Sequence, residues 1–207
     1  MSGFIGMAFT PYKDWFISNT PLNLILMTTL LFFCEEKWQK GLLYFFLLCF
    51  ATGMTVEMIG VNTGLLFGSY QYGTVMGIQL KGVPLLIGFN WFVIVYCCGI
   101  ATMQLSEWLQ SRNLINLNGL VRNWIFIVAG ALLATLFDWL MEPIAVALGF
   151  WKWNTPDIPF LNYGCWFFTS AALLFMMRKM SFHPKNHFAL PLLLIQILFF
   201  LSLRIFL

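Results

Sequence analysis

The apolar stretch from Trp124 to Phe150 most constrains the fold, because it has the length of a membrane-spanning helix and yet contains two carboxyl groups. Asp138 and Glu142 lie four residues apart, so a helix presents both on one face. Pro143 cannot donate to the carbonyl group of Trp139, which predicts a kink. A charge at mid-bilayer costs roughly 3 kcal/mol or more. We therefore expect the two acids to face a functional site, or alternatively to bond a neighbouring helix as a structural pair.

The composition indicates that this stretch is one of several membrane spans. Of the 207 residues, 60% are hydrophobic and 9% are charged, whereas a soluble domain carries roughly 25% charged residues. The net charge of +3 is too small to indicate a nucleic-acid partner. We therefore expect an integral membrane protein with a single transmembrane domain over residues 1–207.

Division of the chain into apolar segments of about 20 residues predicts an all-α, polytopic bundle of six transmembrane helices. The expected spans are residues 15–34, 41–60, 83–104, 124–150, 162–177 and 188–207. After the second span, Gly60, Gly64 and Gly68 recur at helical spacing. Such a ladder is typical of close helix packing, or of a backbone face that a flat ligand can approach. The Gly-rich segment from Gly60 to Tyr72 is also a candidate for a re-entrant piece.

Basic residues predict the orientation of the spans. Seven of the eleven Lys and Arg residues fall in the turns after the first, third and fifth spans. The positive-inside rule places these turns in the cytoplasm and both termini outside. In this orientation Glu57, Asn90, Asp138 and Glu142 all fall in the non-cytoplasmic half of the bilayer. We therefore expect these four polar groups to meet at one depth.

Carboxyl groups in an apolar pocket suit proton chemistry on an apolar substrate. Burial favours the neutral form of a carboxyl group, which can donate a proton, while a second carboxylate acts as a base. Addition of water to an electron-rich alkene is one such reaction, because an acid protonates one carbon and a base-held water captures the resulting cation. Aromatic faces stabilise a cation, although indoles also anchor membrane interfaces. The aromatic candidates are Tyr70, Tyr72, Trp91, Trp139, Trp151, Trp153 and Trp166.

Other kinds of chemistry have less support in the sequence. His183 and His187 are separated by Pro184 in a basic turn, which disfavours a helical pair of metal ligands. Neither a glycine-rich nucleotide motif nor a nucleophile elbow is present. The five cysteines lack metal-ligand spacing and are expected to pack as small hydrophobes. We therefore expect no metal and no organic cofactor.

Three blocks of sequence between Glu57 and Trp166 form a joint signature. The first runs from Glu57 through Gly60, Asn62, Gly64 and Gly68 to Tyr70 and Tyr72. The second holds Gly82-Val83-Pro84 and Asn90-Trp91. The third joins Asp138–Pro143, Gly149–Trp153 and Ile158–Trp166. In this order the blocks resemble the carotenoid 1,2-hydratase family, in which Asp-Pro is usual where this chain has Glu142-Pro143.

The resemblance implies cofactor-free hydration of the terminal C1=C2 double bond of an acyclic carotenoid end, which gives a tertiary 1-hydroxy carotenoid. We expect Asp138 to be the general acid, with Glu142 or Glu57 holding the water or stabilising the cation. The expected partners are a lycopene- or gamma-carotene-like substrate, water and membrane lipid, in the cytoplasmic membrane of a prokaryote. The residues expected to bind the substrate are Gly60, Asn62, Gly64, Gly68, Tyr70, Tyr72, Asn90, Trp91, Trp139, Trp151, Trp153, Asn162 and Trp166.

Three alternative functions use the same features. A non-enzymatic binder or carrier of a polyene or other isoprenoid lipid would use the Gly-lined face. Another carotenoid-modifying lyase or isomerase would use the same acids. A proton-coupled transporter is the third alternative, although the two halves of the chain show no convincing internal repeat.

Cysteine accessibility tests the predicted orientation. Lys13 and Lys179 are each replaced by Cys in a variant that lacks the five native cysteines. We expect a membrane-impermeant thiol reagent to label position 13 in intact cells, and position 179 only after the cytoplasmic face has been exposed. Labelling of position 13 from the cytoplasmic side alone would contradict this orientation.

Overall fold

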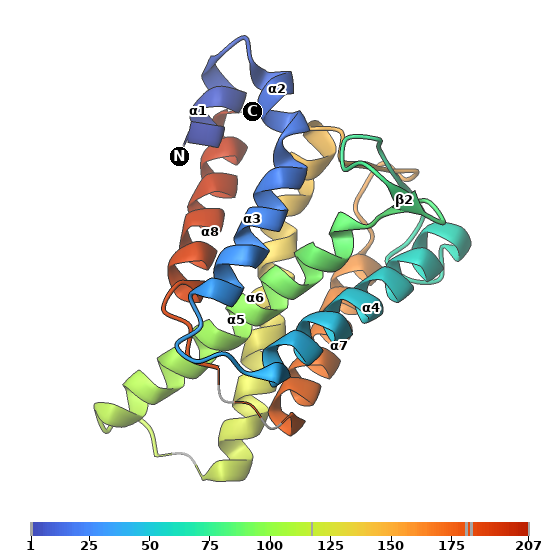
Figure 1. Ribbon diagram of the computed structural model, residues 1–207. Helices are drawn as coiled ribbons and strands as arrows, with labels where there is room; N and C mark the ends of the chain where they lie inside the picture. Colours follow the sequence, from blue (N-terminus) through green and yellow to red (C-terminus); the bar gives the residue numbers. More distant parts are fainter. Residues whose placement is uncertain (1, 117, 181, 183, 207) are drawn as a thin grey trace.

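The computed structural model describes residues 2–116, 118–180, 182 and 184–206, which form a helical bundle with a small β-containing cap (Figure 1). Eight α-helices and four short β-strands lie within these residues. The helices are α1 (Ser2–Phe9), α2 (Lys13–Ser18), α3 (Thr20–Phe33), α4 (Lys40–Thr63), α5 (Leu86–Ser111), α6 (Gly119–Ala147), α7 (Phe160–Lys179) and α8 (Ala189–Phe206). The strands are β1 (Tyr70–Tyr72), β2 (Gln79–Leu80), β3 (Val83–Pro84) and β4 (Trp151–Trp153).

Among the described residues, five helices are long and apolar enough to cross a membrane, namely α4 to α8. They correspond to the second to sixth predicted spans and indicate a membrane protein. The first predicted span is instead divided between α2 and α3. The side chain of Asn19 bonds back to the carbonyl oxygen of Trp15, and Pro21 occupies the first turn of α3. At 14 residues, α3 is shorter than the roughly 20 that a bilayer requires, so the count of six spans is not confirmed.

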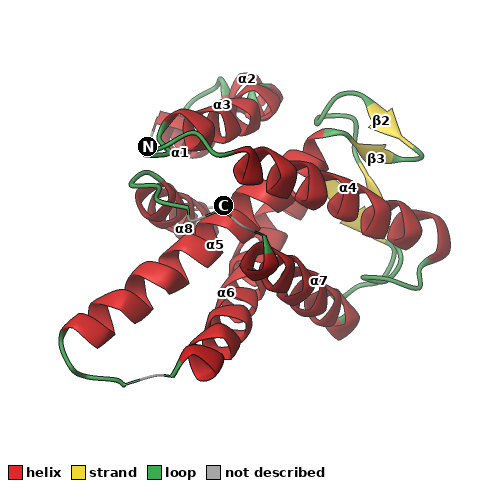
Figure 2. Ribbon diagram, turned by 60° about the horizontal axis from the view of Figure 1, so that its bottom comes forward, coloured by secondary structure: helices red, strands yellow, loops and turns green. Residues whose placement is uncertain are grey.

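Helix α5 is the central element and contacts α3, α4, α6, α7 and α8 (Figure 2). Every residue from Trp91 to Ile100 is buried, as expected for a helix that is apolar on all sides. Helix α4 approaches it closely at Gly53, where a Cβ atom would lie 2.5 Å from the Trp91 indole. This close approach brings the Trp91 ring against α4, one turn before Glu57.

The Gly-rich segment after α4 ends the helix and leads into a strand. Gly64 adopts a left-handed conformation with φ 69°, and its N–H caps the helix at the carbonyl oxygen of Gly60. Strand β1 then pairs antiparallel with β4, which follows α6, and β2 pairs with β3. A re-entrant piece in residues 60–72 is therefore not confirmed. Both ends of the chain lie toward the same end of the bundle as these strands (Figure 1).

At the opposite end, buried Glu35 joins the turn after α3 to the turn before α8. Its carboxylate accepts hydrogen bonds from the Tyr96 hydroxyl at 2.6 Å, the Lys185 backbone N–H at 2.6 Å and the Asn186 amide at 3.3 Å. Asn186 also donates to the carbonyl oxygen of Leu31 at 2.7 Å and accepts from backbone N–H groups at the start of α8. These bonds fix α3, α5 and α8 relative to one another.

We predict that Glu35→Ala lowers the stability of the protein far more than Glu36→Ala. The first change removes the acceptor of three hydrogen bonds, two of them from the buried side chains of Tyr96 and Asn186, and costs roughly 3 kcal/mol. The second removes an exposed ion pair, Lys185 Nζ to Glu36 Oε2 at 3.6 Å, whose contribution is typically below about 1 kcal/mol. Thermal unfolding in detergent, followed with a dye that reacts with the buried thiols, measures both variants. Equal unfolding temperatures would contradict this account of Glu35.

Candidate functional site

Three carboxyl groups from two helices surround one small pocket beneath the cap. Glu57 comes from α4, whereas Asp138 and Glu142 come from α6, and all three are buried. Asn90 of α5 lines the same pocket, so the expected meeting of these four groups is confirmed. The pocket has a volume of about 20 Å³. Because a water molecule needs roughly 10–15 Å³, the space suits one water.

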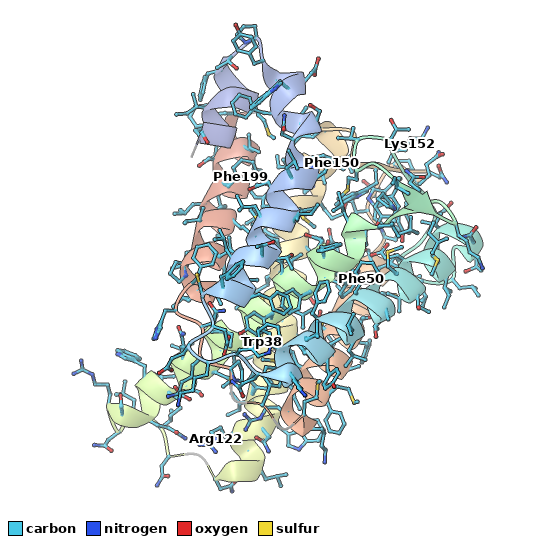
Figure 3. The ribbon with its side chains drawn as sticks, in the orientation of Figure 1. Trp38, Phe50, Arg122, Phe150, Lys152 and Phe199 are labelled. Atoms are coloured by element: carbon cyan, nitrogen blue, oxygen red, sulfur yellow. The ribbon has the colours of Figure 1, made fainter. Side chains whose placement is uncertain are left out.

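The β1–β4 ladder brings four aromatic rings to this pocket. Its register pairs Tyr70 with Trp153 and Tyr72 with Trp151. Side chains alternate along a strand, so these four rings face inward and line the pocket. The residues between them are exposed, and Figure 3 shows one of them, Lys152, at the outer edge of the cap. Two segments about 80 residues apart in the sequence therefore act together on one side of the site.

Glu57 accepts three hydrogen bonds from aromatic side chains. The hydroxyl groups of Tyr70 and Tyr72 donate to Oε2, the second at 2.8 Å, and Trp91 Nε1 donates to Oε1 at 3.1 Å. Burial, together with the negative charge of Glu57, raises the pKa of Tyr70 and Tyr72 above that of a free phenol, so both remain donors. Gly60 leaves space for Tyr70, because a Cβ at this position would lie 2.9 Å from the phenol oxygen.

Glu142 and Asp138 are linked through one amide. The indole N–H groups of Trp151 and Trp153 both donate to Glu142 Oε2 at 3.0 Å. Asn162 of α7 donates to Asp138 Oδ2 at 2.8 Å and approaches Glu142 Oε1 at 3.5 Å. Within the described residues, Asp138 accepts this single hydrogen bond, whereas each of the other two carboxyl groups accepts three. Asp138 is therefore the carboxyl group with the least support for a negative charge.

Aromatic faces complete the lining of the pocket. The indoles of Trp91 and Trp166 stack with ring centroids 4.0 Å apart and an interplanar angle of 13°. The ring centroids of Tyr70 and Trp153 lie 5.1 Å apart. In the described part of the chain, no Lys, Arg or His side chain lines the pocket. A positive charge that formed on a bound molecule would thus meet carboxyl groups and π-faces, which both stabilise it.

Most of the residues predicted for the site lie together, and the structure adds three more. Those lining the pocket are Glu57, Tyr70, Tyr72, Asn90, Trp91, Asp138, Glu142, Trp151, Trp153, Asn162 and Trp166. The additions are Phe67, Ile87 and Met141. Phe67 and Ile87 are apolar residues that no sequence pattern distinguishes. Met141 lies three residues after Asp138, so helical spacing on α6 would have identified it.

Trp139 was predicted for the site but lies on the outer face of α6. Its side chain is 49% exposed, and the guanidinium carbon of Arg204 on α8 lies 4.4 Å from the ring centroid. The reason is helical geometry, because a residue next to Asp138 points about 100° away from it. The structure therefore does not bring Trp139 to the carboxyl groups.

Four further predicted residues of the Gly-rich segment support the site without lining the pocket. Asn62 is exposed and donates to the carbonyl oxygens of Met58 and Lys81, which holds the β2–β3 turn against α4. Gly60 lies under Tyr70, Gly64 caps α4, and Gly68 has φ 120°. At Gly68 a Cβ would lie 2.8 Å from Pro159. The three glycines thus shape the turn into β1, and Asn62 fixes the β2–β3 turn.

Metal ligands were not expected from the sequence. Of the two histidines considered in the sequence, His183 lies outside the described residues. Within the described residues, no group of three or more His, Cys, Asp or Glu side chains is arranged to hold a metal ion.

The sequence is similar to one family of proteins and to a curated protein. The sequence model of a family described as "Carotenoid biosynthesis protein" matches residues 4–207. A bisanhydrobacterioruberin hydratase of Haloarcula japonica is 29% identical over 126 residues, which are 58% of this chain and 40% of that relative. The chain thus spans less than half the length of the curated relative that it matches. No solved structure gives a significant match.

We predict that Gly60→Ala destabilises the protein, whereas Gly164→Ala does not. The added methyl group at position 60 would lie within 3.0 Å of the Tyr70 hydroxyl, the Leu66 carbonyl oxygen and the Phe67 ring. At Gly164 of α7 a Cβ meets no atom within 4 Å, and alanine in a helix is favoured over glycine by roughly 0.5–1 kcal/mol. Thermal unfolding should therefore shift downward for the first variant and stay level or rise for the second. An unchanged unfolding temperature for Gly60→Ala would contradict this packing.

Proposed function

Because the chain belongs to the carotenoid biosynthesis protein family, we propose that it adds water to the terminal C1=C2 double bond of an acyclic carotenoid end group. The product is a tertiary 1-hydroxy carotenoid, formed from a lycopene- or gamma-carotene-like substrate in the cytoplasmic membrane of a prokaryote. One observation carries the proposal: a pocket with room for one water is bounded by three buried carboxyl groups and by aromatic rings. Hydration needs these elements, namely an acid, a base, one positioned water and a lining that tolerates a cation.

Asp138 is the proposed proton donor. Hydrogen bonds to a carboxylate stabilise its charged form, and Asp138 accepts only one such bond from Asn162 among the described residues. A neutral Asp138 transfers its proton to C2 of the alkene, and the electron pair of the double bond forms the new C–H bond. The positive charge then remains on C1, which is tertiary and carries two methyl groups. The stacked indoles of Trp91 and Trp166 stabilise this charge.

Glu142 is the better placed of the two proposed bases. It accepts bonds from two indoles, which stabilise its charged form, and it shares the Asn162 amide with Asp138. The water oxygen bonds to C1, and its proton passes to Glu142. Transfer of this proton to Asp138 restores the starting state, so the reaction consumes only the alkene and one water. Glu57, held by three donors, adds negative charge opposite the cation.

Expression in a bacterium that makes lycopene, followed by mass analysis of the pigments, tests the activity and its residues. We expect a product heavier by one water with the unchanged protein. We predict that Asp138→Asn lowers product formation by about 100-fold or more, the usual contribution of a general acid. Its matched control is Trp139→Phe, the next residue on the outer face, which should retain activity. If the unchanged protein and every variant bind the pigment but the mass of the pigment never changes, the protein is a carrier and not an enzyme.

The origin of the oxygen atom tests the mechanism directly. Membranes that contain the protein are incubated anaerobically, with a chelator, in oxygen-18-labelled water. We expect the label in the tertiary hydroxyl group, since the proposed reaction takes its oxygen from water. A product that forms only in air and carries oxygen from labelled dioxygen would overturn the mechanism.

A further inference from the structure

A second and larger cavity adjoins the acid pocket. It has a volume of about 360 Å³ and lies among α1, α2, α3, α5, α6 and α8. Four residues line both spaces, namely Ile87, Asn90, Met141 and Trp151. The acid pocket and this cavity therefore share one wall.

The acid pocket and the larger cavity differ in volume and therefore in the molecules that they can hold. The acid pocket, at about 20 Å³, holds a water molecule but not the branched end of an isoprenoid. An apolar cavity of roughly 150 Å³ holds a benzene ring, so 360 Å³ has room for roughly fourteen carbon atoms, or two to three isoprene units. A terminal alkene can reach the acids only if the chain behind it occupies the larger cavity.

The lining of the larger cavity selects an uncharged, apolar ligand. Helix α8 contributes Phe199 and Phe200, and α6 contributes Phe137 and Ala145. Asn19 and neighbouring residues supply uncharged polar groups on the α2–α3 side. Within the described residues no charged side chain lines this cavity. A ligand with a phosphate or carboxylate group inside it would have no counter-charge, and its burial would be costly.

Two residues that line the cavity and are exposed lie on the neighbouring helices α3 and α8. They are Asn23 of α3 and Ile195 of α8, whose side chain is 50% exposed. Figure 1 shows these two helices side by side along one side of the bundle, and Figure 3 shows Phe199 on α8 on this side. Helix α8 is apolar enough to cross a membrane, so an opening between α3 and α8 would face lipid. A polyene dissolves in the bilayer and would reach such an opening without passing through water.

We propose that this cavity binds the last two to three isoprene units of a linear, uncharged polyene that enters from the lipid between α3 and α8. The terminal double bond then lies at the shared wall formed by Asn90 and Met141, next to the carboxyl groups, while water occupies the acid pocket. The assignment of the polyene rests on the proposed function, but the binding itself can be measured without turnover.

Two substitutions of equal size at neighbouring exposed positions test the opening. Ile195 lines the cavity, whereas Leu194 does not, and both side chains are 50% exposed on α8. The proteins are purified in lipid nanodiscs from lycopene-producing cells, and the bound pigment is measured per protein by visible absorbance. We expect Ile195→Trp to lower bound lycopene about tenfold and Leu194→Trp to leave it unchanged, because an indole overpacks the cavity only from position 195.

A second pair tests the interior of the cavity. Ala145 is buried in its lining and Ala147 is exposed on the same helix. Ala145→Phe should release the pigment, and Ala147→Phe should retain it, provided that both unfold at the temperature of the unchanged protein. If Ala145→Phe is unstable, the pair on α8 decides the question.

The outcomes separate this inference from the proposed function. Equal pigment content in all variants, equal loss in both members of the α8 pair, or no pigment in the unchanged protein would each overturn the cavity assignment. Pigment that depends on position 195 without any product heavier by one water would leave the cavity assignment standing and refute the hydratase.

Discussion

The structure depends on hydrogen-bond donors that reach three carboxyl groups buried among apolar helices. An unpaired carboxylate in such a place would cost several kcal/mol. The donors come from β1 and α5 for Glu57, from β4 for Glu142, and from α7 for Asp138. Each carboxyl group therefore joins its own helix to another element, and the small residues Gly53 and Gly60 give the aromatic donors the space to approach.

The site combines two environments that share one wall. On the side of the cap, polar hydrogens surround a space for a single water. On the side of α3 and α8, aliphatic and aromatic side chains surround a space for hydrocarbon. The shared wall at Asn90 and Met141 is where a water and an alkene would come into contact. If the chain acts as proposed, such an arrangement would limit the water that reaches a reactive cation and would thereby favour one addition product.

Hydropathy predicted the five long helices, and antiparallel threading predicted that Glu57, Asn90, Asp138 and Glu142 would meet. The ordered motifs also resembled the family that the full-length match identifies. The pairing of β1 with β4 could not be predicted, because three-residue strands far apart in the sequence carry no periodic signal. The break at Asn19 did carry a signal, because Ser18-Asn19-Thr20 followed by Pro21 is typical of a helix boundary, but division of the chain by length and hydropathy passed over it. Trp139 was assigned by residue type, although its position on the helix already pointed away from the acids.

The register of the β1–β4 ladder restricts how this protein can vary in evolution. All four inward rings occupy alternate positions, so inserting or deleting one residue before Tyr70 or before Trp151 would turn two rings outward together. A change before Tyr70 would remove the two tyrosine donors of Glu57, and a change before Trp151 would remove the two indole donors of Glu142. Insertions of two residues, or of one residue absorbed in a bulge, preserve the alternation. The Tyr-x-Tyr and Trp-x-Trp triplets are therefore expected to be inherited as a unit, whereas the outward-facing Lys152 between the two indoles is under no such constraint.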